Sequence, residues 1–256
     1  MNEFELLAEL ERRGLIVGVE HDAAEIGGLV VTQDTLVEGV HFRFDLLDWR
    51  ELGFRAAAVN ISDLAASGAE PLALVVTLAA PNLDGAVALY EGIAEAGVPV
   101  RGGDTTRADS VVITVTALGR AERVPGRAGA RAGDALVVTG PLGGAGAAFR
   151  DGRLLPPPIR TAEGRELARV ATAMLDISDG LGADAGHIAR RSGCKLVIDL
   201  ERVPLADGAT VDDLSFGEDY ELLAATPDPL GFTVIGRCEE GSGVEPAGLG
   251  GWEHFR

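Results

Sequence analysis

The stretch LGFRAAAVNISDLAASGAEPLALVVTL, residues 52–78, decides the fold class. Its first part, 52–67, is rich in alanine and predicts a helix, with a restart near Asn60 and Ser62 where polar residues interrupt it. Its last part, 72–78, is apolar and β-branched and predicts a strand. A helix and a strand joined by a short glycine turn indicate a mixed α/β chain.

The same pattern continues in both directions from this stretch. Further helices are expected over 4–13, 84–96 with Asp84 as N-cap, from 147, over 161–173 and from about 180. Further strands are expected over 29–32 ending at Asp34, 98–100, 110–118, 135–139, 174–177, 195–200, 220–225 and 232–236, with a turn at 102–104. The glycine- and arginine-rich stretch 119–133 suggests a boundary, which gives two domains, 1–125 and 126–256.

Charge and composition exclude several partners. The 256 residues carry 40 acidic against 22 basic side chains, a net charge of −18, and so acidic a surface repels nucleic acid. Lys195 is the only lysine, so phosphate chemistry must use arginine, backbone N–H groups or metal ions. The first residues lack the basic start of a signal peptide, and the longest apolar stretch, 72–81, is too short to cross a bilayer. We therefore expect a cytoplasmic protein with no membrane partner.

Six aspartates stand among small residues at the expected ends of elements, where a ligand can approach the backbone. They are Asp22, Asp34, Asp63, Asp104, Asp176 and Asp179. Gathered carboxylates need a counter-ion in a poorly solvated cleft, and Mg²⁺ takes hard oxygen ligands and bridges phosphates. Taken singly, each aspartate also fits a turn residue or a helix cap, so both interpretations stand. The chain has no GxxxxGK[ST] loop, which excludes a P-loop enzyme.

Other segments also have two interpretations. The glycine-rich stretch 140–146, between an expected strand and helix, suits either a bound phosphate or a plain connection. The segment 217–222, GEDYEL, places three acids beside a strand, and charge of this kind also blunts an exposed edge strand. No two histidines have metal-ligand spacing, which argues against zinc, and His187 is expected to be structural. His41 is a substrate contact or a core residue, and Trp252 an aromatic platform or a packing anchor.

Five segments, occurring in a fixed order, are more specific together than singly. They are DTLVEGVHF (34–42), NISDLAA (60–66), GGDTT (102–106), DISDGL (176–181) and GEDYEL (217–222). In this order they resemble the thiamine-monophosphate kinases, which belong to the superfamily that includes aminoimidazole ribonucleotide synthetase. The resemblance runs from about residue 15 to the last residues.

This resemblance implies a fold and a reaction. The fold is a two-domain α/β (α+β) architecture of the PurM-like type, in which the N-terminal sheet pairs into a barrel across a homodimer and an α/β domain follows. The N-terminal domain would bind ATP and Mg²⁺ and form the dimer. The enzyme would be a thiamine-phosphate kinase that transfers the γ-phosphate of ATP directly to thiamine monophosphate, with several Mg²⁺ ions and no phosphoenzyme.

The resemblance also implies the site residues. The implied metal ligands are Asp22, Thr32, Gln33, Asp34, Asp63, Asp104, Asp176 and Asp179, of which Asp104 and Asp179 are also expected to be catalytic. The implied ATP contacts are Tyr90, Gly103, Asp104, Arg127 and Ser178. The implied contacts to thiamine monophosphate are His41, Glu218 and Trp252.

One position departs from the family's pattern. Glu20-His21-Asp22 stands where the family has Gly-Asp-Asp, so we expect a weakened metal site in which Asp22 keeps its role and His21 donates a hydrogen bond behind it or faces solvent. Two alternative functions stay open. One is a superfamily relative that uses ATP to activate a carbonyl or carboxamide oxygen, and the other is a non-catalytic nucleotide or thiamine-phosphate binding protein.

Overall fold

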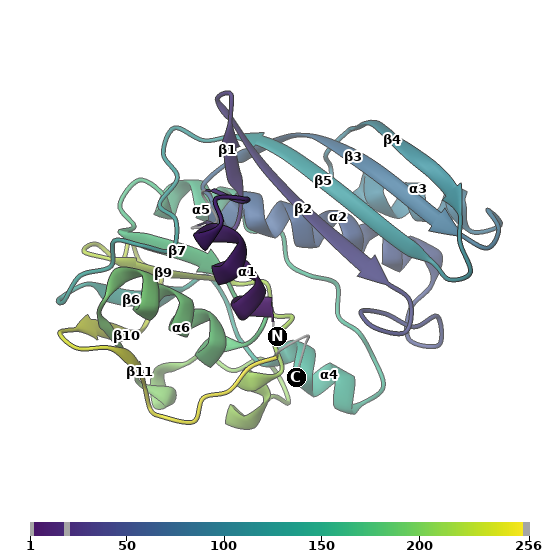
Figure 1. The fold of residues 1–256 in the computed structure, drawn as a ribbon. Coiled ribbons are helices and arrows are strands. Elements are labelled where there is room, and N and C mark those ends of the chain that lie inside the picture. The colour runs from purple at the N-terminus through teal and green to yellow at the C-terminus, as the bar shows by residue number, and fades with distance from the viewer. Residues whose placement is uncertain (1–2, 18–20, 253–256) are drawn as a thin grey trace.

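Two β-sheets, with helices between and beside them, make up the computed structural model, which describes residues 3–17 and 21–252 (Figure 1). The N-terminal sheet has the strand order β1-β2-β5-β3-β4, and the C-terminal sheet has the order β11-β8-β10-β6-β9-β7. Within the first sheet β3 and β4 are parallel and the other pairs antiparallel. The expectation of a mixed α/β chain is confirmed.

The element bounds are as follows. The helices are α1 (Glu3–Arg12), α2 (Trp49–Ala66), α3 (Ala86–Glu95), α4 (Gly144–Arg150), α5 (Thr161–Leu167) and α6 (Leu181–Ser192), and short 3₁₀ segments are η1 (Leu200–Arg202) and η2 (Val211–Ser215). The N-terminal strands are β1 (Ala24–Ile26), β2 (Leu29–Val37), β3 (Glu70–Ala80), β4 (Val100–Arg107) and β5 (Val112–Arg120). The C-terminal strands are β6 (Ala135–Val138), β7 (Ala173–Asp176), β8 (Lys195–Ile198), β9 (Leu222–Thr226), β10 (Thr233–Glu239) and β11 (Gly243–Glu245).

Helix α2 is one unbroken helix. Asp48 and Glu51 form a reciprocal capping box at its start, which satisfies backbone donors that no preceding turn can bind. The expected restart near Asn60 and Ser62 is wrong. The Asn60 side chain donates to the carbonyl of Ala56 at 2.9 Å within the helix, so this polar residue is satisfied without a break.

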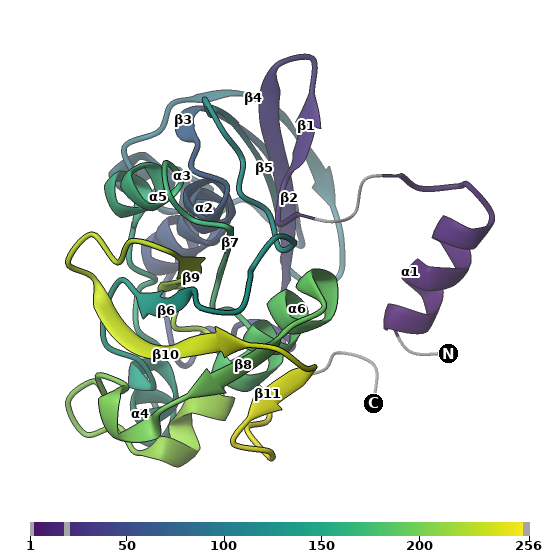
Figure 2. The same cartoon turned by 90° about the vertical axis from the view of Figure 1, so that its left-hand side faces the viewer.

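Both sheets pack on α2, which is why it is buried almost all round. Its apolar residues join the core under the N-terminal sheet, whose large buried side chains include Leu52, Ile61, Leu64, Leu74 and Ile113. Its last turn packs against the C-terminal sheet in a second core with α5, formed by Ala65, Ala66, Val137, Leu167, Met174 and Leu222. In Figure 2, α2 and α3 lie behind the N-terminal sheet, on the side away from α1. The helix therefore fixes the position of one sheet relative to the other.

The expected turn at 102–104 is wrong, because these residues lie inside β4. Thr77 of β3 is the register partner of Asp104. The side chains of 101–107 are all exposed at the sheet edge, so the strand lacks the apolar alternation that would identify it. Strand β2 likewise continues past Asp34, where the sequence predicted its end, to Val37.

Several other boundaries differ from expectation. Helix α3 begins after Gly85, so Asp84 is not its N-cap. The helix expected over 161–173 ends at Leu167, and α4 begins three residues before Ala147. The sequence did not predict β1, which pairs with β2 through the tight turn Gly27-Gly28, where both residues have positive φ as a two-residue hairpin requires.

No helix within residues 3–17 or 21–252 combines the length and apolar character that a bilayer crossing requires.

The close crossing of α2 and α3 gives a stability prediction. A Cβ on Gly53 would lie 1.9 Å from the carbonyl oxygen of Leu89, so Gly53→Ala forces the helices apart. We expect the free energy of unfolding to fall by about 1–3 kcal/mol, measured by urea denaturation. Gly186→Ala in α6 is the control, since its nearest neighbour is the flexible end of Arg190 at 3.1 Å, and it should stabilise by about 0.5–1 kcal/mol. Equal stability of the two variants would contradict the close-packed crossing.

Candidate active site

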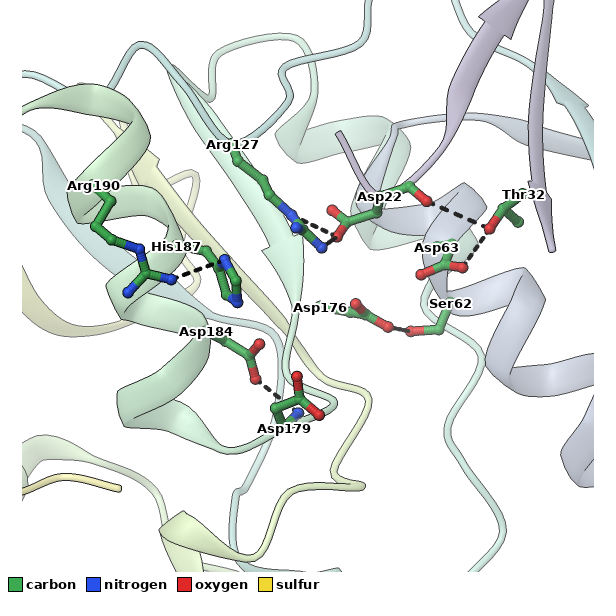
Figure 3. Close-up of polar contacts among 10 residues, drawn as sticks. All are labelled: Asp22, Thr32, Ser62, Asp63, Arg127, Asp176, Asp179, Asp184, His187 and Arg190. Atoms are coloured by element: carbon green, nitrogen blue, oxygen red, sulfur yellow. Dashed lines mark hydrogen bonds and ion pairs between the residues drawn. The ribbon is translucent and has the colours of Figure 1, made fainter. Parts of the chain in front are cut away.

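Three carboxylates meet where the end of α2, the segment just before β1 and the end of β7 come together (Figure 3). Asp22, Asp63 and Asp176 each offer an oxygen, and these oxygens all lie within 4.8 Å of one another. We call this group the carboxylate cluster. Its members are between 41 (Asp22 to Asp63) and 154 (Asp22 to Asp176) residues apart in the chain, so only the fold brings them together.

Each carboxylate of the cluster is held by a neighbour. The Thr32 hydroxyl donates to Asp63 at 2.5 Å, and the Ser62 hydroxyl donates to Asp176 at 2.5 Å. Arg127 forms an ion pair with Asp22 and donates to it from Nε at 2.9 Å. These contacts fix the direction of each carboxylate and leave its other lone pairs available.

Asp34 lies beside the cluster on β2. Its backbone N–H donates to the side-chain oxygen of Asn60 at 2.9 Å, which ties the strand to α2. Burial raises the pKa of the Asp34 carboxyl, and the nearby charges of Asp22 and Asp179 raise it further. This coupling shows that Asp34 and Asp179 lie in the electrostatic field of the cluster.

Burial and mutual repulsion make the cluster a strong proton acceptor. Burial, followed by the charge of Asp22, raises the pKa of Asp176 to about 7. Burial and the charges of Asp34 and Asp176 raise the pKa of Asp63 well above its usual range. Burial also raises the pKa of Asp22, although Arg127 opposes the shift. The described cations beside the cluster therefore do not balance its charge, and hard oxygen ligands of this kind suit divalent cations such as Mg²⁺.

A second group follows Asp176 along the chain. One oxygen each of Asp179 and Asp184 and one nitrogen of His187 lie within 4.8 Å of one another. Asp184 accepts hydrogen bonds from the backbone N–H groups of Asp179 and Gly180, each at 3.0 Å. Burial and then the charge of Arg127 lower the pKa of His187 to about 4, so its imidazole is neutral at pH 7.

Asp184 was not among the residues expected from the sequence. His187 was expected to be structural, which stays a prediction, and its Nδ1 lies 3.1 Å from Nη2 of Arg190. The detectable signal was their helical spacing, since Asp184 and His187 are three residues apart on α6 and share a face. Both follow Asp179, which was already a candidate. Asp184 is an acid in the first turn of a helix that begins just after the candidate ligand Asp179, and this position is the signal that the sequence offered.

Backbone hydrogen bonds hold the loop 177–179 from two further segments. Tyr220 N–H donates to the Ile177 carbonyl and Glu218 N–H to the Ser178 carbonyl, each at 2.8 Å. Trp252 N–H donates to the Asp179 carbonyl at 2.9 Å. The fold thus brings the expected nucleotide contact Ser178 next to the expected substrate contacts Glu218 and Trp252.

Three expected site residues lie away from the carboxylate cluster in this chain. Asp104 and Gly103 are on β4, three strands across the sheet from β2, or roughly 14 Å at the usual strand spacing. Tyr90 packs against the N-terminal core from α3. Gln33, by contrast, lies on β2 between Thr32 and Asp34, with its side chain exposed. The spacing of the six aspartates left open whether they converge, and within one chain Asp104 lies away from the carboxylate cluster.

The histidines near the start of the chain are also placed. His41 lies in the loop after β2, and its Nδ1 accepts the backbone N–H of Val37 at 3.0 Å. His21 is half-buried against Gly126, and its Nδ1 has no partner among the described residues. Its Nδ1 atom is buried while the residue as a whole is half-exposed, so the expectation for His21 stays a prediction. Glu20 lies outside the described residues.

The segment 217–222 is not an exposed edge strand. Strand β9 is flanked by β6 and β7, and Asp219 and Glu221 are buried. Asp219 accepts the backbone N–H of Gly143 at 2.8 Å, while Arg160 donates to both oxygens of Glu221. Because Asp219 already accepts a hydrogen bond at the start of α4, the stretch 140–146 serves as a connection between β6 and α4, and a carboxylate of the chain itself occupies the start of this helix.

Comparison with known proteins gives consistent matches. Residues 20–121 match the family model described as AIR synthase related protein, N-terminal domain. The thiamine-monophosphate kinase of Pyrococcus horikoshii is 36% identical over 89% of this chain and 86% of its own length, and that of Aquifex aeolicus is 33% identical over 89% and 88%. A solved structure, AaThiL complexed with AMPPCP and TMP, has a TM-score of 0.91 and 32% identity, covering 99% of this chain and 97% of that one. The α/β fold that the resemblance implies for a single chain is confirmed, and the barrel across a homodimer stays a prediction.

The raised pKa of Asp176 predicts a pH-dependent stability in chelator. The folded carboxyl titrates at about 7 against an ordinary value of 3.8, so between these values the folded state binds more protons and stability falls as pH rises. Within this range, one such group lowers the free energy of unfolding by about 1.4 kcal/mol for each unit by which the pH rises. His187 acts in the opposite sense between its folded pKa of about 4 and its ordinary 6.5.

The Asp176 contribution is therefore measured as a difference. Urea denaturation of the wild type and of Asp176→Asn, in chelator across this pH range, should show the variant gaining relative stability as pH rises. Asparagine can still accept the Ser62 hydroxyl, so the hydrogen bond is retained. Parallel pH profiles for the two proteins would contradict the shifted pKa.

Proposed function

The chain belongs to the thiamine-monophosphate kinase family, and on this premise we propose that its carboxylate cluster binds several Mg²⁺ ions and that ATP phosphorylates thiamine monophosphate there. The family gives the activity, a thiamine-phosphate kinase that uses ATP and forms thiamine diphosphate. A relative with 32% identity has been solved complexed with AMPPCP and TMP. Direct in-line transfer without a phosphoenzyme is part of the proposal.

The observation that carries the metal proposal is the meeting of Asp22, Asp63 and Asp176 within 4.8 Å. Burial raises the pKa of each of them, which means that the folded chain holds carboxylates together at an electrostatic cost. A divalent cation offsets that cost, and the donors are all hard oxygens. When bound, Mg²⁺ would neutralise charge on the phosphate oxygens and leave positioning to the protein.

The chain's own residues then have distinct roles in the proposal. The metal ligands are Asp22, Thr32, Gln33, Asp34, Asp63, Asp104, Asp176 and Asp179. The ATP contacts are Tyr90, Gly103, Asp104, Arg127 and Ser178, and the acceptor contacts are His41, Glu218 and Trp252. Arg127 offers a permanent cation next to Asp22, where a nucleotide phosphate would otherwise meet only carboxylates. Trp252 is 56% exposed, so its indole is accessible to an aromatic ring.

A homodimer would complete this site. Asp104 and Gly103 lie at the far edge of the N-terminal sheet from Asp34 and the carboxylate cluster. The sheet face opposite α2 and α3 carries partly exposed side chains such as Thr35, Val75 and Thr116. Pairing of this face with a second copy into a barrel would cover it and could bring Asp104 of one protomer to the cluster of its partner.

The proposal also assigns the two parts of the chain and its location. Residues 1–125 would bind ATP and Mg²⁺ and form the dimer, and residues 126–256 would form the second α/β domain. The cytoplasm is the proposed location. We propose no nucleic-acid partner, because the net charge is −18.

The metal proposal predicts a strict dependence on Mg²⁺ or Mn²⁺. Formation of thiamine diphosphate from ATP and thiamine monophosphate should stop in excess chelator and return with either ion, because hard oxygen donors favour them. Zinc alone should not restore the rate. Full turnover in chelator would contradict the proposal.

The proposed site predicts that two aspartate variants lose activity. Asp104→Asn and Asp179→Asn each keep the side-chain shape but remove a charge near bound phosphate, so each should lose roughly 100-fold or more in kcat. The folded state of each is checked by thermal denaturation. Wild-type turnover in both would mean that these residues are only strand and loop acids.

Co-expression of the two variants separates a shared site from a site within one chain. If Asp104 acts on the partner's cluster, a mixed dimer contains one intact site, and a random mixture recovers about one quarter of the wild-type rate. If both residues act within one chain, mixing restores nothing. The second result would contradict the shared site.

A further inference from the structure

Arg55 is a buried cation outside the carboxylate cluster. It lies on α2 and is only 3% exposed. Its guanidinium forms an ion pair with Glu218 and donates from Nη1 to the Leu155 carbonyl at 2.9 Å. Burial lowers the pKa of the Arg55 side chain, which shows that this charge depends on its few partners.

Glu218 has an unusual backbone that Arg55 helps to hold. Its φ is 62°, in the left-handed region that residues with a Cβ rarely adopt, and Tyr220 has a φ of 51°. Such strained backbone persists only where the surroundings impose it. The Arg55 ion pair and the backbone hydrogen bond from Glu218 to Ser178 are two of the contacts that impose it here.

Arg55 and Ser62 lie on the same face of α2. They are seven residues apart, which is about two turns and about 10 Å along the helix axis. Ser62 binds Asp176 of the carboxylate cluster, and Arg55 binds Glu218. One rigid helix therefore holds two acids of the C-terminal half at a set spacing.

We propose that Arg55 is a positioning residue for the phosphate acceptor: it holds Glu218 at a fixed distance from the carboxylate cluster, so that the acceptor's ring end contacts Glu218 while its phosphate reaches the metal site. The inference rests on the proposed function, which assigns Glu218 to the acceptor. Arg55 pairs with Oε2 of Glu218, and the Glu218 side chain is 28% exposed, so the carboxylate remains accessible to a ligand. Arg55 itself acts only through Glu218.

A cavity next to Arg55 makes the proposal directly testable. It has a volume of about 350 Å³, and its lining includes Arg55, Leu47, Phe54 and Leu154. The Nε of Arg55 has no hydrogen-bond partner among the described residues. Truncation of Arg55 would open a space next to this cavity that fits a guanidinium group. Free guanidinium could then enter that space from solvent through the cavity.

The first test is steady-state kinetics of Arg55→Ala. We expect KM for thiamine monophosphate to rise about 10- to 100-fold, the usual effect of removing a group that orients a binding residue, with KM for ATP near the wild-type value. Added guanidinium should lower the raised KM, whereas sodium chloride at the same ionic strength should not. A purely structural role would change both KM values together and would give no rescue.

Matched variants exclude a general effect of the cavity or of charge. Arg50→Ala removes another arginine from the same lining, but its partners Glu91 and Glu95 are exposed, so KM for the acceptor should not change. Arg55→Lys retains a cation but has one nitrogen in place of the planar guanidinium, so it should give an intermediate KM. This variant remains available if Arg55→Ala does not fold. In a Glu218→Ala background, Arg55→Ala and Arg55→Lys should each add no further rise, because coupled residues are not additive.

The outcomes separate the inference from the proposed function. A wild type without thiamine monophosphate turnover would overturn the proposed function and, with it, the acceptor assigned to Glu218. An active wild type beside a folded Arg55 variant with unchanged acceptor KM would overturn the inference alone. Additive effects of the Arg55 and Glu218 changes would also overturn it.

Discussion

The burial of α2 on both sides is the constraint on which the rest of the structure depends. A helix in this position cannot expose its polar side chains to water, and an unpaired buried polar group costs several kcal/mol. Asn60 therefore binds the backbone of Asp34, and Ser62 binds Asp176. Each of these pairings brings a residue from another part of the chain to the helix. The site thus forms where the buried polar side chains of α2 find their hydrogen-bond partners.

Charge balance is the second constraint, and it acts against the first. The fold gathers carboxylates where water is excluded, and among the described groups only Arg127 is ion-paired to the cluster, through Asp22. The raised pKa values of Asp63 and Asp176 record the remaining imbalance. Stability alone would favour fewer acids here. The imbalance makes sense for a site whose missing positive charge arrives with its ligands.

The sequence predicted the elements whose periodicity was strong. Helix α2 and strand β3 were evident from alanine-rich and β-branched runs, and the small residues around certain aspartates pointed to Asp22, Asp63 and Asp176. The sequence could not predict β4, because an exposed edge strand of Gly102-Gly103 and polar residues has no burial pattern to detect. It also missed the burial of Asp219 and Glu221, since their partners Gly143 and Arg160 lie far away in the chain. Pairing across the fold, which decides such cases, is not visible in local composition.

The tight contact between α2 and the C-terminal half has a consequence for motion. A Cβ on Gly164 of α5 would lie 2.2 Å from the carbonyl oxygen of Ala65, and Ala66 is packed in the same core as Met174. A hinge between the two halves would have to break this contact, so the contact opposes clamshell closure over a ligand. The oxygens of Asp22, Asp63 and Asp176 are therefore already within 4.8 Å of one another in the chain alone, before a nucleotide arrives.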